Sequence, residues 1–591
     1  MGKLISLKTP PGVWRNGTAY EAKDRWHDCN LVRWKEGKLQ PLGGWQETIG
    51  ASLSGIGRAM LTWRDYSGDK WLAIGTNEKL YVFTSLSGTS SDITPDLTPT
   101  FVTGNADASI GIGFGAGDFS GTRSVDNGTV TGTDISFTAS GSVIASSSTT
   151  FTDGATAANG VGPLPFGVGD EIEISGSSES ANNKTYPLSH RIVTVSANQI
   201  TVGATNGSAV YATNTLVDDA AGDSVTIKRT RRYGNENTEQ SSLVLESSSW
   251  IFDLWGQNLV GMSTADGRIY EWNPTSSNPT GTRAALVSNA PTNNYAMLVS
   301  KERHMFALGA NGNNRSILWS DRENNTTWTA TATNQAGGFY IDTSGKILAG
   351  KTVGDQILIW TTTDVHALSF IGSPYVYSRK KIGDACGAIS NRSMVAVGDM
   401  AFWMSQGGFF QYQGSVIPLK CDVSDYVFGD MNHVQDSKIY ASVNAEFFEV
   451  TWWYADSNSD EILRYCTFNY SEGWWSIGEL CRTAWADAGV FESPIAIADD
   501  KKIYEHEKAA SRTTQQIAQT NADVSNFERK LVTGGESTDV GLTFAETGWQ
   551  EIGSGDNVTN MSQLITDTSG HGDNGLRFKI KTSYTPNGEE S

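Results

Sequence analysis

Residues 258–272 read NLVGMSTADGRIYEW, a short apolar run followed by a polar turn and a second run with aromatic side chains. The turn ADG supplies the Asp and Gly that tight hairpins need for positive φ. Short apolar runs bounded by such a turn are typical of paired strands. This stretch therefore predicts a β-hairpin.

The same unit recurs along the chain. The other copies are WLAIGTNEKLYVF (71–83), HMFALGANGNNRSILW (304–319), QILIWTTTDVHALSF (356–370), MAFWMSQGGFFQY (400–412), FFEVTWWYADSNSDEILRYCTF (447–468) and PIAIADDKKIYEH (494–506). From residue 258 onward their starts are 46, 52, 44, 47 and 47 residues apart. A period in the forties is typical of four-stranded propeller blades, which bury both sheet faces against their neighbours. One or two β-sandwiches with coincidental spacing are the alternative.

A long region between the first two hairpins has a different composition. All 19 tryptophans fall at positions 14–71, 250–485 and 549. Residues 101–232 are instead rich in Ser, Thr, Gly, Ala and Asn, which marks an inserted module. Within it, residues 166–203 alternate apolar and polar residues in three short runs, so we expect a small antiparallel sheet or barrel there.

The sequence thus predicts an all-β chain, a six- or seven-bladed β-propeller with an inserted small β-barrel or β-sheet domain and a terminal platform-type β region. The expected divisions are an N-terminal platform or interface segment (1–60), a first blade (61–100), the insertion (101–232), the remaining blades (233–508) and a C-terminal linker with a β subdomain (509–591).

The charge of the chain limits its partners. A formal net charge of −20 disfavours tight binding to nucleic acid and to anionic lipid. The first 45 residues instead carry a local positive charge, with eight cations against four acids. No run approaches 18 apolar residues, and the first 30 residues lack an apolar core. We therefore expect neither a membrane span nor a signal peptide, and folding in a cytoplasm.

Catalytic and metal-binding motifs are absent from the sequence. There is no GxxxxGK[ST], HExxH or GxSxG pattern and no zinc-ligand spacing. The five cysteines and seven histidines are dispersed, and the glycine run GIGFGAGD (111–118) does not match GxGxxG. We therefore expect no enzyme activity, no cofactor and no metal. Propellers can also be glycosidases, which need two carboxylates about 5–10 Å apart, and the sequence leaves that alternative open.

Two pairs of adjacent tryptophans, Trp452–Trp453 and Trp474–Trp475, offer stacking surfaces for sugars or bases. In a strand, however, neighbouring side chains point to opposite faces, which suits a blade buried on both sides. The sequence around the first pair is acidic rather than basic. We therefore predict that both pairs belong to the core.

Three stretches carry a family resemblance. They are PPGVWRNGTAYEAKDRWHDCNLVRWKEGKLQPLGGW (10–45), ILIWTTTDVHALSFIGSPYVYSRKKIGDACGAISNRSMVAVGDMAFWMSQGGFFQYQGSVIPLKCDVSDYVF (357–428) and NAEFFEVTWWYADSNSDEILRYCTFNYSEGWWSIG (444–478). Their pattern of spaced aromatics and glycines resembles tail nozzle proteins of short-tailed bacteriophages, also called tail tubular protein B. The resemblance covers roughly residues 10–100 and 235–505.

This resemblance implies a homo-hexameric tube at the distal end of a virion tail, assembled in the host bacterial cytoplasm. It implies contact with tail adaptor (head-to-tail connector) proteins, and tail fibres or a host-surface receptor are further expected partners. Viral DNA would cross the channel without sequence-specific binding, repelled by carboxylates on the wall within a Debye length of about 8 Å. Two alternatives are a glycan-binding adhesin or depolymerase and a cytoplasmic propeller scaffold.

The stretch RWHDCNLVRWKEGKLQPLGGW (25–45) combines aromatics with cations near the N-terminus. Interleaved acids make it a weak site for a polyanion. We expect a strand-turn-strand that forms a subunit or adaptor interface, with an internal strand pair as the alternative. The candidate interface residues are Arg25, Trp26, Arg33, Trp34 and Trp45.

If that interface exists, Trp34→Ala will lower ring assembly without altering the folding of the blades. Ring formation by negative-stain microscopy, alongside circular dichroism for the blades, measures the two effects separately. Normal rings from the variant would refute the interface role of Trp34.

Overall fold

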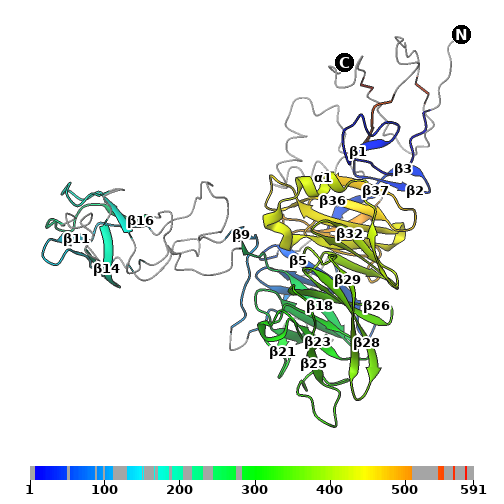
Figure 1. Ribbon diagram of the computed structural model, residues 1–591, viewed down its shortest axis with the longest axis horizontal. Helices are drawn as coiled ribbons and strands as arrows, with labels where there is room; N and C mark the ends of the chain where they lie inside the picture. Colours follow the sequence, from blue (N-terminus) through cyan, green and yellow to red (C-terminus); the bar gives the residue numbers. More distant parts are fainter. Residues whose placement is uncertain are drawn as a thin grey trace. The chain divides into compact units, whose positions relative to one another are not determined.

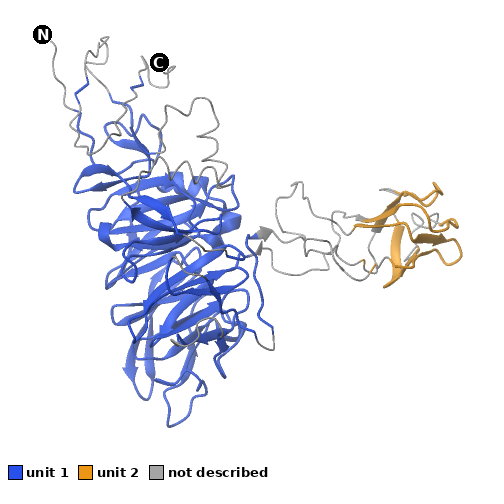
Figure 2. Cartoon of the chain, turned by 180° about the vertical axis from the view of Figure 1, so that it is seen from behind, with its two compact units in different colours: residues 1–109, 245–591 blue, residues 110–244 orange. Residues whose placement is uncertain are grey.

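The computed structural model describes residues 7–48, 53–86, 90–96, 100–110, 129–148, 151, 166, 171–184, 190–203, 216–230, 244–274, 282–508, 543–550, 564–565 and 580–581. The chain divides into two compact units, residues 1–109 with 245–591, and residues 110–244 (Figure 2). The predicted glycine run (111–118) and most of the predicted C-terminal linker and subdomain lie outside the described residues.

The first unit contains seven four-stranded antiparallel sheets, the blades of a β-propeller (Figure 1). In chain order the first three are β5 (Gly57–Arg64), β6 (Lys70–Thr76), β7 (Leu80–Phe83) and β8 (Ser91–Asp92); β18 (Trp250–Trp255), β19 (Asn258–Ser263), β20 (Ile269–Trp272) and β21 (Ala285–Leu286); and β22 (Ala296–Val299), β23 (Met305–Leu308), β24 (Ser316–Trp319) and β25 (Gly337–Tyr340).

Blades 4 to 6 follow the same order without interruption. They are β26 (Ile347–Val353), β27 (Gln356–Thr361), β28 (Asp364–Gly372) and β29 (Val376–Asp384); β30 (Met394–Val397), β31 (Met400–Ser405), β32 (Gly408–Tyr412) and β33 (Val416–Leu419); and β34 (Tyr440–Asn444), β35 (Glu449–Ala455), β36 (Ile462–Asn469) and β37 (Trp475–Glu479).

Blade 7 takes strands from both ends of the propeller sequence. Its first three strands are β38 (Ala484–Ala486), β39 (Ile495–Ile497) and β40 (Ile503–Lys508), and its outer strand is β4 (Gly44–Glu47). β4 pairs antiparallel with β40, so a strand near the N-terminus completes the last blade and closes the ring. Residues 44–47 therefore belong to a blade, and blade 1 begins at Gly57 rather than at residue 61.

The predicted hairpins are confirmed as the repeating element. Each of the seven quoted stretches covers nearly all of the second and third strands of one blade, from β6 and β7 in blade 1 to β39 and β40 in blade 7. The predicted count of six or seven blades resolves to seven. The first strands β5, β18, β22, β26, β30, β34 and β38 contact one another in a closed cycle, so they line the central channel.

The core of the propeller is divided among the spaces between blades. Each pair of neighbouring blades encloses its own apolar cluster, as between blades 1 and 2, where Trp71 and Trp272 meet edge to face with ring centroids 5.2 Å apart. Trp452 and Trp453 point into different clusters, one toward blade 5 and one toward blade 7, as predicted for a blade buried on both faces. Trp475 is buried and Trp474 lies half-buried against the same cluster.

The N-terminal segment adds strands outside the blades. β1 (Trp26–Asn30) pairs with β41 (Phe544–Thr547), and β2 (Val32–Lys35) forms a hairpin with β3 (Lys38–Pro41). β1 lies against β37, the outer strand of blade 6, near the short helix α1 (Ser424–Asp430) (Figure 1). The platform role of this segment stays a prediction.

The second unit has a sheet and a core of its own. Its strands run in the order β10 (Thr129–Gly132), β16 (Val225–Thr230), β13 (Glu171–Ser175), β14 (His190–Ser196), β15 (Gln199–Val202), β12 (Val143–Ser146) and β11 (Ile135–Thr138). Its core is rich in isoleucine and contains no tryptophan. β9 (Ser109–Ile110) pairs with β17 (Val244–Leu245), and the second unit spans residues 110–244, where the sequence predicted an insertion at 101–232.

A close backbone approach between blades 1 and 2 gives a test of this packing. A Cβ at Gly75 would lie 2.3 Å from Cγ of Trp250, whose indole Nε1 donates to the Thr76 carbonyl at 2.8 Å. We expect Gly75→Ala to lower the free energy of unfolding by about 1–3 kcal/mol because the indole must move. Gly407→Ala is the matched control, since nothing lies within 4 Å of its Cβ position. Equal denaturation midpoints for the two variants would contradict the packing.

Candidate functional site

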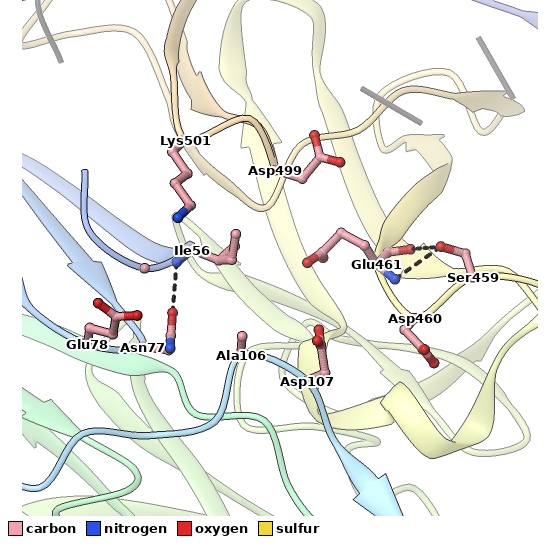
Figure 3. A pocket seen from close by; sticks show the side chains of 11 residues that line it. Ile56, Asn77, Glu78, Ala106, Asp107, Ser459, Asp460, Glu461, Asp499 and Lys501 are labelled. Carbon is pink, nitrogen blue, oxygen red and sulfur yellow. Dashed lines mark hydrogen bonds between the residues drawn. The ribbon is translucent and has the colours of Figure 1, made fainter. Parts of the chain in front are cut away.

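A pocket of about 540 Å³ opens on the propeller among blades 1, 6 and 7. Its walls come from the turns between the second and third strands of these blades and from a backbone segment at residues 106–107 (Figure 3). The charged side chains that line it are Glu78, Asp107, Asp460, Glu461, Asp499 and Lys501. Five carboxylates against one ammonium make the lining acidic.

Two buried cations lie against this lining. The Arg58 guanidinium donates to both oxygens of Glu461, at 2.7 Å each, and to the Ala106 carbonyl at 2.8 Å. Lys438 Nζ lies 2.5 Å from Oδ1 of Asp107. Arg58 lies on β5 of blade 1 and Glu461 precedes β36 of blade 6, so the ion pair joins two blades. Together the two cations offset two of the five carboxylates, Glu461 and Asp107.

Two carboxyls of the pocket have opposite pKa shifts. Burial alone would raise the pKa of Glu461, but the charge and hydrogen bonds of Arg58 outweigh it and lower the pKa. Burial raises the pKa of Asp499, and the nearby charge of Glu461 raises it further. An acid and a base with separated pKa values are what glycoside hydrolysis requires.

Glu461 is nevertheless poorly placed for chemistry. Both of its oxygens are held by Arg58, and its Oε1 also accepts the Ile462 backbone N–H at 2.8 Å. A carboxylate with its lone pairs so occupied is a weak nucleophile or base. The pocket therefore suits the binding of a polar or cationic group better than bond cleavage. Among the described residues no group of three or more His, Cys, Asp or Glu side chains could hold a metal ion.

Segments that lead to and from the insertion lie along the same face of the propeller. Gln435 forms two hydrogen bonds of 2.9 Å with Ala108. The Ala108 backbone N–H donates to Oε1 of Gln435, and Nε2 of Gln435 donates to the Ala108 carbonyl. On the return segment, Ser247 N donates to Oγ of Ser437 at 3.1 Å, and Ser248 N donates to the Asn105 carbonyl at 2.9 Å. Both segments are thus hydrogen-bonded to residues 435–437, which come just before β34 of blade 6.

The predicted interface residues are mostly inside the chain. Arg33, Trp34 and Trp45 are each 4% exposed, so they fit the internal alternative and not an open interface edge. Trp34 packs with residues of blades 5 and 6, and Trp45 lies between blades 6 and 7. Arg25 and Trp26 are half-buried, and Arg25 pairs with Asp422 at 3.0 Å. Loss of Trp34 is therefore expected to disturb the blades themselves, contrary to the expectation from sequence.

Arg33 is the centre of a buried charge cluster. Its Nε lies 3.0 Å from Oε1 of Glu449, its Nη2 lies 2.6 Å from Oε1 of Glu507, and its guanidinium stacks over the Phe447 ring at 3.6 Å. Burial raises the pKa of Glu449 to about 7, against the opposing effect of Arg33. The cation that the sequence suggested for an external partner thus fastens the N-terminal segment to blades 6 and 7.

The pocket residues were missed because they occupy ordinary hairpin turns. The turns NEK and ADDK contain Glu78, Asp499 and Lys501, and turn-forming residues are expected there on structural grounds alone. The sequence does show several acidic turns, but it does not show that closure of the ring brings the turns of blades 1, 6 and 7 together to form one acidic pocket. All five cysteines are free. No helix in the described ranges is long and apolar enough to cross a membrane.

Comparisons with known proteins bear on the fold. No family model and no curated protein matches the chain. Similar solved structures include a chain of a nidogen–laminin complex, 11% identical over 42% of this chain and 85% of that one, with a TM-score of 0.26. The WD40 domain of Neurospora crassa Pan2 is 8% identical over 48% and 81%, with a TM-score of 0.28.

A third structure covers more of this chain. The extracellular domain of the putative one component system BT4673 from B. thetaiotaomicron is 10% identical over 81% of this chain and 56% of that one, with a TM-score of 0.30. At this level of similarity the propeller is assigned from the strand pairing of the chain itself.

Replacement of Arg33 tests the charge cluster. Arg33→Met leaves two carboxylates without their cation, and we expect the free energy of unfolding to fall by about 3–5 kcal/mol at pH 7.5. Without Arg33 the pKa of Glu449 rises further above its unfolded value. A carboxyl whose folded pKa is raised destabilises the folded state only where it is ionised, at pH values above that pKa. At pH 5 Glu449 is protonated, so the loss of stability caused by Arg33→Met should be smaller than at pH 7.5.

Chemical denaturation at the two pH values measures both effects. Arg315→Met is the control, because Arg315 and Asp342 form an exposed pair worth at most about 1 kcal/mol. A deficit for Arg33→Met that is the same at both pH values would contradict the role of the two carboxylates.

Proposed function

We propose that this chain is a structural subunit of a bacteriophage tail, the nozzle through which the genome is retained and then ejected. The observation that carries the proposal is that the three stretches with the family resemblance join in space. Asn16 Nδ2 donates to the Cys421 carbonyl at 2.8 Å, which ties residues 10–45 to 357–428. Val13 N donates to the Trp475 carbonyl at 2.8 Å, which ties them to 444–478. A resemblance that maps to one contiguous body supports a shared function better than scattered matches do.

The charge of the chain fits a conduit. In the proposed hexamer each copy contributes a formal charge of −20 to a tube that encloses DNA. Carboxylates on the wall would repel the phosphate backbone within a Debye length of about 8 Å. The genome would then slide instead of adhering. Proposed partners are five further copies of the chain, tail adaptor proteins, and fibres or a host receptor.

We propose a structural and not a catalytic role. The pocket carboxylate with the lowered pKa, Glu461, is committed to Arg58 on both oxygens. The ion pair joins two blades, which is a structural role that needs no ligand.

A glycan-binding adhesin is the second candidate, and the pocket is the observation that favours it. Carboxylates and the Asn77 amide line its wall, and such groups accept and donate hydrogen bonds to sugar hydroxyls. In that case a single chain would bind saccharide without forming a ring.

Negative-stain microscopy and mass photometry of the purified chain test the first proposal. We expect six-fold rings with a central hole and a mass six times that of the monomer. A monodisperse monomer that binds saccharides on a glycan array would overturn the nozzle in favour of the adhesin. A monomer without saccharide binding would overturn both proposals in favour of a scaffold.

A point variant locates the contact between copies. The tip of the β28–β29 hairpin lies in a stretch with the resemblance and exposes apolar Ile371 (55%) and Tyr375 (77%). We expect rings to bury this tip, so Tyr375→Asp should lower the hexamer fraction. Tyr66→Asp is matched in exposure (78%) on blade 1, outside the 357–428 and 444–478 stretches, and should assemble normally. Equal hexamer fractions for both variants would remove the tip from the interface.

A further inference from the structure

Three turns of the propeller meet at a surface point away from the pocket. They join the first and second strands of blades 1, 2 and 3 and contain Tyr66, Gly256 and Arg303. The pocket is built instead from turns between second and third strands. Successive turns of an antiparallel sheet lie at opposite ends of it, so the two features are separate.

Gly256 lies between the other two side chains. A Cβ at this position would be 2.8 Å from Oη of Tyr66 and 3.3 Å from Nη2 of Arg303. Gly256 is exposed and has a φ of +67°, a conformation that glycine adopts without strain. The phenol hydroxyl and the guanidinium thus converge on one exposed point above a backbone that carries no side chain.

Both converging groups have donors without an acceptor. In the part of the chain that the structure describes, neither the Tyr66 hydroxyl nor the Arg303 guanidinium forms a hydrogen bond. Nε of Arg303 is buried and unbonded, and Oε2 of Glu323 lies 3.9 Å from it. That separation exceeds hydrogen-bond distance, and the Glu323 side chain is 62% exposed, so this ion pair leaves the guanidinium open to another acceptor.

The buried indole of Trp255 orients the guanidinium. Cζ of Arg303 lies 5.2 Å from the centroid of the Trp255 ring, which is a cation–π contact. A guanidinium held in this way presents its N–H groups as a planar fork that matches the two oxygens of a carboxylate. The Tyr66 hydroxyl can donate a third hydrogen bond to the same carboxylate.

The surroundings of this fork narrow the choice of ligand. A single guanidinium with Glu323 beside it favours a monoanion over a dianion such as phosphate. The Tyr66 ring is 78% exposed next to the fork, and an exposed aromatic face packs well against the C–H face of a sugar ring. Sugar acids combine the two features, one carboxylate and a pyranose ring.

We propose that Tyr66 and Arg303 bind the carboxylate of a hexuronic acid above Gly256. The Arg303 guanidinium donates two hydrogen bonds to the carboxylate, the Tyr66 hydroxyl donates a third, and the Tyr66 ring covers one face of the sugar. This site goes beyond the proposed nozzle and does not depend on it, because all its residues belong to one chain. It also differs in charge from the acidic pocket.

Ligand-observed saturation-transfer NMR on the full chain tests the proposal, with D-glucuronate as the probe at constant ionic strength. We expect saturable binding that is about tenfold or more tighter than that of D-glucose or acetate, since each lacks one half of the ligand. Arg303→Met should weaken glucuronate binding by about tenfold or more. Arg303→Lys should restore little of it, because an ammonium lacks the planar fork.

Variants of Tyr66 keep the test independent of folding. Tyr66→Phe removes a hydroxyl that is 2.8 Å from the Gly256 Cβ position, and it should leave the thermal midpoint unchanged. It should weaken glucuronate binding by about threefold to tenfold, and Tyr66→Ala should weaken it further because the ring is lost. Arg315→Met, at an exposed arginine of blade 3, is the control and should bind glucuronate as the wild type does.

Three results would overturn the site. They are an absence of glucuronate binding to the wild-type chain, an equal affinity for glucuronate and either D-glucose or acetate, and wild-type affinity in both Arg303→Met and Tyr66→Phe. Ring formation is measured separately by microscopy, so failure of this site and failure of the proposed nozzle are distinguishable.

Discussion

Burial of both faces of every blade is the constraint on which this structure depends. A four-stranded sheet exposed on one side would leave its aromatic residues in water, so each blade needs a neighbour on either side and the series has to close. The separate apolar clusters between neighbouring blades show how the chain meets this need. Large rings such as Trp71 and Trp272 fill the wedge-shaped spaces, and glycine at position 75 makes room where an indole crosses the backbone.

Features formed by residues close together in the sequence could be predicted, whereas contacts between residues far apart in the sequence could not. One hairpin occupies about fifteen consecutive residues, so the repeat of hairpins could be found in the sequence. The burial of Trp452 and Trp453 in two different clusters could be predicted because adjacent side chains of a strand point to opposite faces. Trp34 and Trp45 were misread because an aromatic pattern does not say whether the matching surface belongs to the same chain. The pocket escaped notice because its carboxylates come from turns of three blades that only ring closure brings together.

Charge has different roles in different parts of the propeller. Arg33 and Arg58 are buried cations that fasten segments together, and each faces carboxylates in direct contact. Exposed pairs such as Arg315 with Asp342 lie in water and contribute little to stability. In the proposed hexamer each chain would add its net charge of −20 to the tube.

Closure of the ring by β4 also means that the propeller cannot close during synthesis until β40 has been made. This strand emerges early, whereas its partner β40 is synthesised roughly 455 residues later. At roughly 5–20 residues per second, translation leaves β4 without its partner for roughly 20–90 s. During that interval the nascent chain is an open arc whose terminal blades expose strand edges and apolar faces, the features that chaperones recognise and that promote aggregation. Until β40 is made, the incomplete propeller therefore exposes surface that the closed ring buries.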